Sequence, residues 1–366
     1  MPHFDIIRTA QPKKTFRVAS VIGTYDLQEN QVQEHFVGDI NFPDDWQIGL
    51  IVGGSGTGKT TIAKELFPNA YVEKFDYTHE CLLDDMPQDC SVSDITKTLT
   101  SVGFASVTSW LKSYNVLSNG EKMRCDLARA ILSPNDFFVF DEFTSVVDRN
   151  VAQIGSFAMQ KAIRKTKKRF IAVTCHYDVE DWLLPDWVFD TNSMTFRLCE
   201  GQKKKNRPTC KLDIYETKQK QYYWSIFRKY HYLSHSHNNA ARVFVATLNG
   251  QLCAFTSMLP FPHPHKKNYW KGHRTVVLPD FQGLGIGITL RNYVAQLFIN
   301  DGKGVIMTTS NPSMIASLKK SPLWITTRIG RMTSGSCNGI IQNKFVKGST
   351  SCNRITASFE YIGKPQ

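Results

Sequence analysis

The sequence predicts an α/β protein of two domains, and three observations support this prediction. A glycine-rich loop that ends in Lys59 and Thr60 stands between the apolar run at 48–52 and a helix-forming stretch at 61–66. Residues 274–298 repeat this order of strand, glycine-rich turn and helix. The net charge of the chain also changes sign near residue 200. Such strand–turn–helix units are typical of mixed α/β folds, and 366 residues suit two domains at about 150 residues each.

Charge divides the chain near residue 200. Residues 1–200 contain 20 Lys+Arg and 27 Asp+Glu, a net charge of −7, whereas residues 201–366 contain 24 and 5, a net charge of +19. One globular unit rarely divides its charge in this way, so we expect domains at residues 1–202 and 203–366, with a basic linker at 201–208. The second domain is the part that should attract a polyanion such as nucleic acid. The alternative is a solvated basic face that is turned toward the acidic first domain.

Composition excludes several classes of protein. No apolar run approaches the roughly 20 residues of a membrane span, and the N-terminus lacks the apolar region of a secretory signal. The nine cysteines are an odd number without a C-x-x-C pair, which indicates neither a disulfide framework nor a common zinc site. We therefore expect a cytoplasmic protein with reduced thiols and no membrane partner.

The first glycine-rich loop, GGSGTGKT at 53–60, has the spacing G-x-x-x-x-G-K-T. Its glycines let backbone N–H groups turn inward around a phosphate, and the following helix adds its dipole. Lys59 would reach the outer phosphates and Thr60 would ligate Mg²⁺. A glycine-rich turn before an ordinary helix would not need the Lys-Thr pair. The predicted phosphate-binding residues are Gly53, Gly54, Ser55, Gly56, Thr57, Gly58, Lys59, Thr60 and Thr61.

Other elements of the first domain follow from local patterns. Residues 16–22 and 33–37 are predicted as short strands ahead of the loop. Ser118 and Glu121 are spaced as a capping box before a helix at 123–132. Buried strands are predicted at 137–142 and at 169–176. The first ends in Asp141 and Glu142, where Asp141 can hold the Mg²⁺ shell and Glu142 can polarise water; the second ends near His176.

Taken in order, these motifs resemble those of the ATP-binding-cassette (ABC) ATPases over roughly residues 15–200. GGSGTGKT resembles the Walker A motif, LSNGE at 117–121 the signature, VFDEF at 139–143 the Walker B motif, and SVVD at 145–148 the D-loop. The resemblance implies that Glu142 is catalytic and that His176 is the switch histidine. It also implies that Ser118 and Gly120 contact the γ-phosphate of ATP on another subunit, in a head-to-tail homodimer that encloses two ATP molecules.

The resemblance to transporter cassettes is incomplete. Lys59 and Ser118 are 59 residues apart, which is shorter than expected, so the helical subdomain that docks on a membrane partner should be reduced. The position of the coupling glutamine is open between Gln88 and Asp85. Both departures favour a soluble switch of the kind found in nucleic-acid-associated cassettes.

The second domain begins with an aromatic-rich helix predicted at 222–230. Two β-rich runs at 242–248 and 251–257 flank Asn249 and Gly250, and an Asn-Gly pair in this setting is the strongest short-range hairpin signal. A strand at 274–278 precedes the second glycine-rich turn and a helix that runs to about Phe298. A strand at 305–311, a helix at 312–320 and a closing strand at 355–361 complete the expected α+β domain.

The second glycine-rich turn fits the pattern Q-x-x-G-x-G at Gln282, Gly285 and Gly287. Backbone amides at such a helix start can bind a pyrophosphate. With the preceding VVLP, the turn resembles the acyl-CoA loop of the acetyltransferase (GNAT) family over roughly 215–366; the alternative is an unrelated α/β domain with a glycine-rich turn. The resemblance implies that acetyl-CoA, or another acyl-CoA, binds at Val277, Gln282, Gly283, Leu284, Gly285, Ile286 and Gly287.

The catalytic groups of the second domain are less evident. Members of this family often use a carboxylate base and a Tyr acid, but Leu318 or a neighbour falls where the Tyr is expected. Asp280 lies nearest the cofactor loop and could simply shape the turn. His231 and Tyr232 are further candidates, because His is the natural base near neutral pH. Their polar cluster is alternatively a metal site or a solvated loop, and it also contains Ser234, His235 and His237.

HYLS at 231–234, the hairpin, VVLPDFQGLGIG and SPLW at 321–324 together resemble the Mom-type DNA-modifying acyltransferases of bacteriophages. This resemblance implies acylation of the exocyclic amine of adenine, in a base that is first taken out of the stack. Aromatic residues among Lys and Arg also suit base stacking. Two alternatives remain open. One is acylation of a protein, tRNA or small-molecule amine under control of the ATPase, and the other is a non-catalytic DNA-binding module on a defence or repair ATPase.

Overall fold

The computed structural model describes residues 3–9, 13, 15–26, 33–199, 210–231, 236–331 and 355–363. By their contacts, the residues of the chain divide into two compact units. The first unit is Met1–Phe75 with Ser133–Arg207, and the second is Asp76–Leu132 with Pro208–Gln366. Residues 76–132, which carry the LSNGE motif, therefore group with the C-terminal part of the chain rather than with the phosphate loop.

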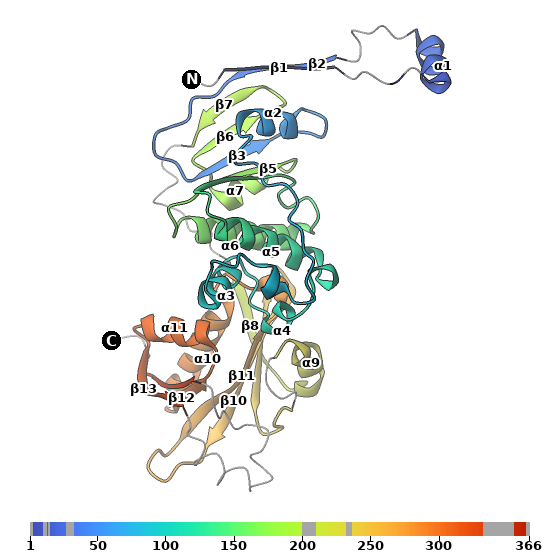
Figure 1. Ribbon diagram of the computed structural model, residues 1–366. Helices are drawn as coiled ribbons and strands as arrows, with labels where there is room; N and C mark the ends of the chain where they lie inside the picture. The colour runs from blue at the N-terminus through green and yellow to red at the C-terminus, as the bar shows by residue number, and fades with distance from the viewer. Residues whose placement is uncertain are drawn as a thin grey trace. The chain divides into compact units, whose positions relative to one another are not determined.

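A five-stranded sheet forms the centre of the first unit, with the strand order β4-β5-β3-β6-β7. Strands β3 to β6 run parallel, and β7 is antiparallel to β6. Every residue of β3 is buried, as expected for a parallel strand that is covered on both faces. Figure 1 shows α2 on one side of this sheet and α6 and α7 on the other. The bounds are β3 (Ile48–Val52), β4 (Phe137–Phe140), β5 (Arg169–Thr174), β6 (Trp187–Asp190), β7 (Thr195–Leu198), α2 (Lys59–Leu66), α6 (Arg149–Ile163) and α7 (Val179–Leu183).

An antiparallel pair, β1 (His3–Thr9) with β2 (Gln33–Asp39), also belongs to the first unit. Phe4 and Phe36 from these strands enter the same core as Ile62 of α2. The strand predicted at 33–37 is confirmed as β2. The strand predicted at 16–22 is wrong, because this segment forms helix α1 (Phe16–Tyr25).

The error at α1 has a local physical cause. The side chain of Thr15 accepts a hydrogen bond from the backbone N–H of Val18 at 3.3 Å, which is the cap that a helix start requires. The apolar residues Val18, Val21, Ile22 and Tyr25 have the i, i+3, i+4, i+7 spacing of a helix. The β-branched side chains of Val18, Val21 and Ile22 favoured a strand in the sequence, but this spacing and the Thr15 cap favour the helix.

The second unit begins with the helical segment 76–132. It contains η2 (Leu82–Asp85), α3 (Val92–Ser101), α4 (Val107–Trp110), η3 (Tyr114–Val116) and α5 (Asn119–Leu132). The predicted helix at 123–132 is confirmed as the greater part of α5. Helix α3 buries Ile95 and Leu99, and α5 buries Met123 and Leu127.

A seven-stranded sheet completes the second unit, with the order β13-β14-β12-β11-β10-β9-β8. The pairing is antiparallel except between β11 and β12. The predicted hairpin is confirmed, since Asn249 and Gly250 join β9 to β10 with φ of 51° and 77°. The bounds are β8 (Leu212–Thr217), β9 (Arg242–Leu248), β10 (Gln251–Phe261), β11 (Tyr269–Val277), β12 (Gly304–Thr309), β13 (Trp324–Arg331) and β14 (Ile355–Tyr361).

Helices cover both faces of this sheet. On one face, Trp224 and Phe227 of α9 (Lys220–Phe227) pack on Phe255 of β10. On the other face, Phe298 of α10 (Ile286–Asn300) packs against Phe244 of β9. We call these the α9 face and the α10 face. The remaining elements are η4 (Arg228–Tyr230), η5 (Pro279–Phe281) and α11 (Pro312–Lys320). Within the described ranges, no helix is both long and apolar enough to cross a bilayer.

Candidate functional site

The loop at 53–58 turns the chain from β3 into α2, and two of its glycines leave no room for a side chain. A Cβ atom at Gly53 would lie 2.1 Å from Thr191 Oγ1, and one at Gly58 would lie 2.5 Å from the ring of Phe36. Gly58 also has a φ of 81°, which strains any other residue. Lys59 Nζ donates to the carbonyl oxygen of Gly54 at 2.5 Å. The ammonium group is thus curled over the loop, as a phosphate-binding lysine requires.

Asp141 follows β4 and contacts the start of α2. Its Oδ2 accepts hydrogen bonds from Thr60 Oγ1 at 2.8 Å and from the Tyr71 hydroxyl at 2.6 Å. Burial and the hydrogen bond to Asp141 raise the pKa of Tyr71, which keeps the phenol protonated as a donor. A hydroxyl and a carboxylate are the oxygen ligands that Mg²⁺ uses beside a nucleotide. Thr60 and Asp141 therefore fit the predicted metal site.

Glu142 and His176 lie at the carboxyl ends of neighbouring strands. Because β4, β5 and β3 are adjacent and parallel, the residues that follow them meet at one edge of the sheet. Lys59, Glu142 and His176 follow these three strands. Glu142 is exposed and has a φ of 51°, an uncommon conformation for a residue other than glycine. Such conformations cluster at functional sites, and the catalytic role of Glu142 stays a prediction.

The LSNGE motif caps α5 in the second unit. Ser118 Oγ accepts from the Glu121 N–H at 3.3 Å, and Glu121 Oε2 accepts from the Ser118 N–H at 3.1 Å. This is the predicted capping box. Ser109 Oγ also donates to Glu121 at 2.9 Å. Ser118 is exposed and Gly120 is buried, so the start of α5 presents its serine to solvent.

The second glycine-rich turn joins β11 to α10. Gly283 and Gly285 have φ of 93° and 88°, so both need the conformational freedom of glycine. Among the described residues, β11 pairs with β12 only between 269–271 and 304–306. The later residues of β11 leave that edge open for backbone hydrogen bonds to a ligand. An open strand edge that leads to a helix start fits an acyl-CoA, with its amide-bearing arm and its pyrophosphate.

Gln282 and Asp280 contact the helical segment 76–132. Gln282 Oε1 accepts from the Ala105 N–H at 2.7 Å, and its Nε2 donates to Ser106 Oγ at 3.3 Å and to the carbonyl oxygen of Val277 at 3.1 Å. Arg124 of α5 is 1% exposed and donates to the carbonyl oxygen of Asp280 at 3.1 Å. Its Nη1 lies 3.7 Å from the Asp280 carboxylate. The polar side chains predicted for acyl-CoA binding and catalysis are thus joined to the segment that carries the LSNGE motif.

The predicted polar cluster ahead of the hairpin is described in part. His231 is buried beside Trp224, with their rings 5.8 Å apart. Tyr232 lies outside the described residues, as do Ser234 and His235. Across the described ranges, no group of three or more His, Cys, Asp or Glu side chains could hold a metal ion.

A residue that the sequence analysis missed lies in the middle of β11. The ring of His273 lies 5.4 Å from that of His237. Burial and the nearby Arg274 lower the pKa of His273 to about 3 and that of His237 to about 4. Both imidazoles are therefore neutral at pH 7. The signal in the sequence that could have found His273 was its place beside Arg274 in an otherwise ordinary strand.

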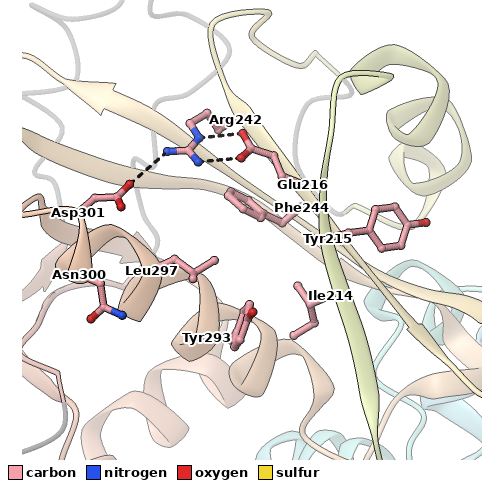
Figure 2. A pocket seen from close by; sticks show the side chains of 9 residues that line it. All are labelled: Ile214, Tyr215, Glu216, Arg242, Phe244, Tyr293, Leu297, Asn300 and Asp301. Carbon is pink, nitrogen blue, oxygen red and sulfur yellow. Dashed lines mark hydrogen bonds and ion pairs between the residues drawn. The ribbon is translucent and has the colours of Figure 1, made fainter.

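A pocket lies on the α10 face, away from these histidines. It has a volume of about 260 Å³. Figure 2 shows Arg242 held between Glu216, at 2.7 and 2.8 Å, and Asp301, at 3.9 Å. A second pocket of about 250 Å³ shares two of its residues. The first is lined by Ile214, Tyr215, Glu216, Arg242, Phe244, Tyr293, Leu297, Asn300 and Asp301, none of which was predicted as a site residue.

Sequence comparison identifies one family. Residues 211–320 match the Acetyltransferase (GNAT) family. The match begins at β8 and ends with α11, so it spans the predicted acyl-CoA loop. No curated protein matches the chain.

Solved structures resemble each part of the chain at low sequence identity. A dimeric bacterial ABC transporter cassette is 15% identical, with 46% of this chain covering 93% of that chain at a TM-score of 0.36. The ribosomal-protein-S18-alanine N-acetyltransferase from Escherichia coli is 15% identical, with 43% covering 97% at a TM-score of 0.31. An IAA acetyltransferase from Bacillus cereus is 15% identical, with 41% covering 99% at a TM-score of 0.31.

The predicted fold class is confirmed as mixed α/β. The second glycine-rich turn lies inside the stretch that matches the GNAT family.

Proposed function

We propose that this chain is an ATP-hydrolysing switch joined to an acyl-CoA-dependent N-acyltransferase that acts on nucleic acid. One observation carries the proposal. Gln282 and Asp280, beside the acyl-CoA loop, bind residues 105–106 and Arg124 of the segment that bears the LSNGE motif. The part expected to sense ATP is thus bonded directly to the part expected to hold the acyl donor.

The first unit supplies the ATPase residues. Lys59 and the backbone N–H groups of 53–60 would hold the phosphates of ATP, and Thr60 with Asp141 would hold Mg²⁺. When bound, ATP would supply the phosphoryl group, and Mg²⁺ would neutralise part of the negative charge on the phosphates. Glu142 would orient and polarise a water molecule, and His176 would contact the outer phosphate.

The second unit supplies the acyltransferase residues. The N–H groups at 283–287 would hold the pyrophosphate of the acyl-CoA at the start of α10. The open edge of β11 would bind the amides of the acyl-CoA arm, with Val277 at its end. The bound acyl-CoA supplies the thioester.

Coupling would run through α5. By resemblance to ABC ATPases, Ser118 and Gly120 contact ATP on a second copy of the chain in a head-to-tail dimer. Arg124 lies about 9 Å along the helix axis from Ser118, at 1.5 Å per residue. A movement of the start of α5 would therefore reach Asp280 through one rigid helix.

A nucleic acid is the proposed acceptor because of charge. Residues 201–366 carry a net charge of +19, which attracts a polyanion. The Mom-type resemblance narrows this acceptor to a base amine in DNA. The second candidate is a non-catalytic DNA-binding module. This alternative is favoured because Leu318 or a neighbour stands where a catalytic Tyr acid was expected.

The test uses the full chain with labelled acetyl-CoA, Mg²⁺-ATP and duplex DNA, followed by mass spectrometry of the nucleosides. We expect a mass-shifted nucleoside that is lost in Gly285→Trp, which fills the acyl-CoA turn. Lys59→Ala should remove the ATP dependence, whereas Lys64→Ala on the same helix should not. Unmodified DNA with intact acetyl-CoA binding would reject the DNA acceptor, and no acetyl-CoA binding would favour the non-catalytic module.

Coupling has its own test. Arg124→Met should leave ATP hydrolysis intact and abolish the effect of ATP on acetyl-CoA affinity, measured by titration calorimetry. An unchanged effect of ATP in this variant would refute transmission through α5. ATP-dependent dimers of Glu142→Gln in gel filtration would support the head-to-tail homodimer, and a monomer at saturating ATP would count against it.

A further inference from the structure

Four polar side-chain atoms without partners gather on the α9 face of the second unit. They are Ser257 Oγ, both ring nitrogens of His237, and His273 Nε2. Each is shielded from solvent, and none has a hydrogen-bond partner among the described residues. Buried polar atoms are normally paired, because an unpaired one costs about 1–3 kcal/mol. A cluster of four therefore indicates a place where a ligand completes the hydrogen bonds.

A β-bulge places His273 in this cluster. In the pairing of β10 with β11, Ser257 lies opposite Arg274 and Met258 lies opposite Gly272, so His273 is the extra residue. Bulges re-aim side chains and are common beside active sites. Gly272 faces Arg291 of α10, and the rings of His273 and His237 meet on the α9 face beside Trp224.

The bulge also lies at the open edge of β11. Pairing of β11 with β12 ends at Lys271, two residues before His273. The open edge was assigned above to the arm of the acyl-CoA. His273 therefore lies where the donor edge of β11 and the unpartnered cluster meet.

The surroundings of His273 are cationic. Lys220 of α9, Arg274 of β11 and Arg291 of α10 all lower the pKa of one or both histidines, and His231 adds to the effect on His273. The elements α9, β9, β10 and β11 contain no Asp or Glu. A carboxylate base of the usual kind is thus absent from these described elements.

The carboxylates of residues 201–366 are engaged elsewhere. Glu216 binds Arg242, Asp301 lies 3.1 Å from Lys303, Glu360 binds Lys266 and Asp280 pairs with Arg124. The fifth, Asp213, is exposed on the edge strand β8. Imidazole is therefore the group on the α9 face that can accept a proton.

We propose that His273 Nε2 is the base for acyl transfer and that the acceptor is a neutral aromatic amine, such as the exocyclic amine of a nucleobase. This inference rests on the acyltransferase function proposed above. The amine nitrogen attacks the thioester carbonyl carbon, a C–N bond forms and the C–S bond breaks. His273 takes the proton from the nitrogen, and the departing CoA thiolate takes a proton from the imidazolium.

The cationic surroundings select against alkylamines. A lysine side chain has an ordinary pKa of about 10.4, so it arrives as an ammonium ion that Lys220 and Arg274 repel. A weakly basic imidazole cannot remove its proton. An aromatic amine is neutral at pH 7 and becomes strongly acidic once it has attacked the thioester, so a weak base suffices. The acceptor must displace the side chains that shield Nε2, as an extruded base does on entering a pocket.

The test compares two acceptors with the full chain, acetyl-CoA and Mg²⁺-ATP. One acceptor is a single-stranded oligonucleotide with all four bases, and the other is a lysine-rich peptide. Thiol release and product mass measure transfer. We expect transfer to the oligonucleotide alone. His273→Gln should lower kcat at least 100-fold, within the range for loss of a general base, with unchanged acetyl-CoA affinity. His265→Gln, at an exposed histidine, is the matched control.

A second measurement does not depend on turnover. Carbon-13 labelled histidine should show His273 and His237 neutral at pH 6 by NMR. A protonated His273 at pH 6, full activity of His273→Gln, or preferential transfer to the peptide would each overturn the inference while leaving the acyltransferase function intact. Failure of the wild-type chain to bind acetyl-CoA would overturn the proposed function and this inference with it.

Discussion

Asp186 holds the start of β3, the strand that leads into the phosphate loop, and we expect Asp186→Asn to loosen that strand. The Asp186 side chain is 3% exposed. Its Oδ2 accepts from the backbone N–H groups of Gln47 at 2.7 Å and Ile48 at 3.0 Å. Arg164 donates to Oδ2 at 2.7 Å and to Oδ1 at 3.0 Å. Asparagine removes the negative charge and can place its amide NH₂ group, a donor, against the N–H groups that donate to Asp186.

The size of the effect follows from these contacts. Breaking a buried ion pair by removing one partner costs about 3–5 kcal/mol. Because the Arg164 side chain is 18% exposed and regains some water, we take the lower end, about 3 kcal/mol. At about 1.4 kcal/mol for each tenfold change, amide exchange in β3 by opening of this strand should accelerate at least a hundredfold.

The assay is hydrogen exchange with mass spectrometry on peptides that cover residues 46–54. Asp181→Asn, at an exposed carboxylate in α7, is the matched control. Acceleration below threefold in Asp186→Asn would refute the reasoning.

Burial raises the pKa of Asp186, but the hydrogen bonds from Arg164, Gln47 and Ile48 outweigh burial and lower the pKa below its ordinary value. The stabilisation by the Asp186 carboxylate is therefore present above the unfolded pKa of about 3.9 and is lost at lower pH. The exchange rates of the wild-type protein and of Asp186→Asn should become equal in acid.

Three further perturbations test the sites. Glu142→Gln should slow ATP hydrolysis at least 100-fold, as expected for a residue that activates water, while ATP binding by calorimetry is retained; equal loss of binding would contradict the assigned role. Gly58→Ala should weaken ATP binding and cost about 1–3 kcal/mol of strain, because its Cβ meets Phe36 at a φ of 81°; unchanged affinity and melting temperature would argue against this. Arg291→Met should change the free energy of urea unfolding by less than about 2 kcal/mol, because removal of a buried charge offsets the lost hydrogen bonds to Arg274 and Thr275. The same variant should slow acyl transfer, because β11 loses these hydrogen bonds beside the bulge. A normal rate of acyl transfer would contradict this role of Arg291.

Local patterns predicted much of the fold and of the candidate sites. The glycines of 53–58, the capping box at Ser118 and the hairpin at Asn249 each encode their geometry within a few residues. Strand ends were equally readable, since apolar runs stop where Asp141 and His176 begin. Such features depend on backbone conformation and on neighbours in the chain, so one sequence suffices.

Long-range contacts were beyond the sequence. Gln282 binds Ala105, which is 177 residues away, and nothing in either segment names its partner. His273 owes its place to a register shift between β10 and β11, and the strand pattern alone does not reveal a bulge. Helix α1 shows the remaining ambiguity, because the β-branched side chains of Val18, Val21 and Ile22 favour a strand whereas their spacing is that of a helix.

The chain passes between its two compact units three times, near residues 75, 132 and 207. A truncation at 202 therefore separates the helical segment 76–132 from the strands and helices it groups with, and neither product contains a whole second unit. Expression of residues 1–202 or 203–366 alone should yield poorly soluble protein. By contrast, a protease cut between 200 and 210 in the folded chain should give two bands on a denaturing gel that still elute together in gel filtration. Dissection of this protein is better done with point variants than with shortened clones.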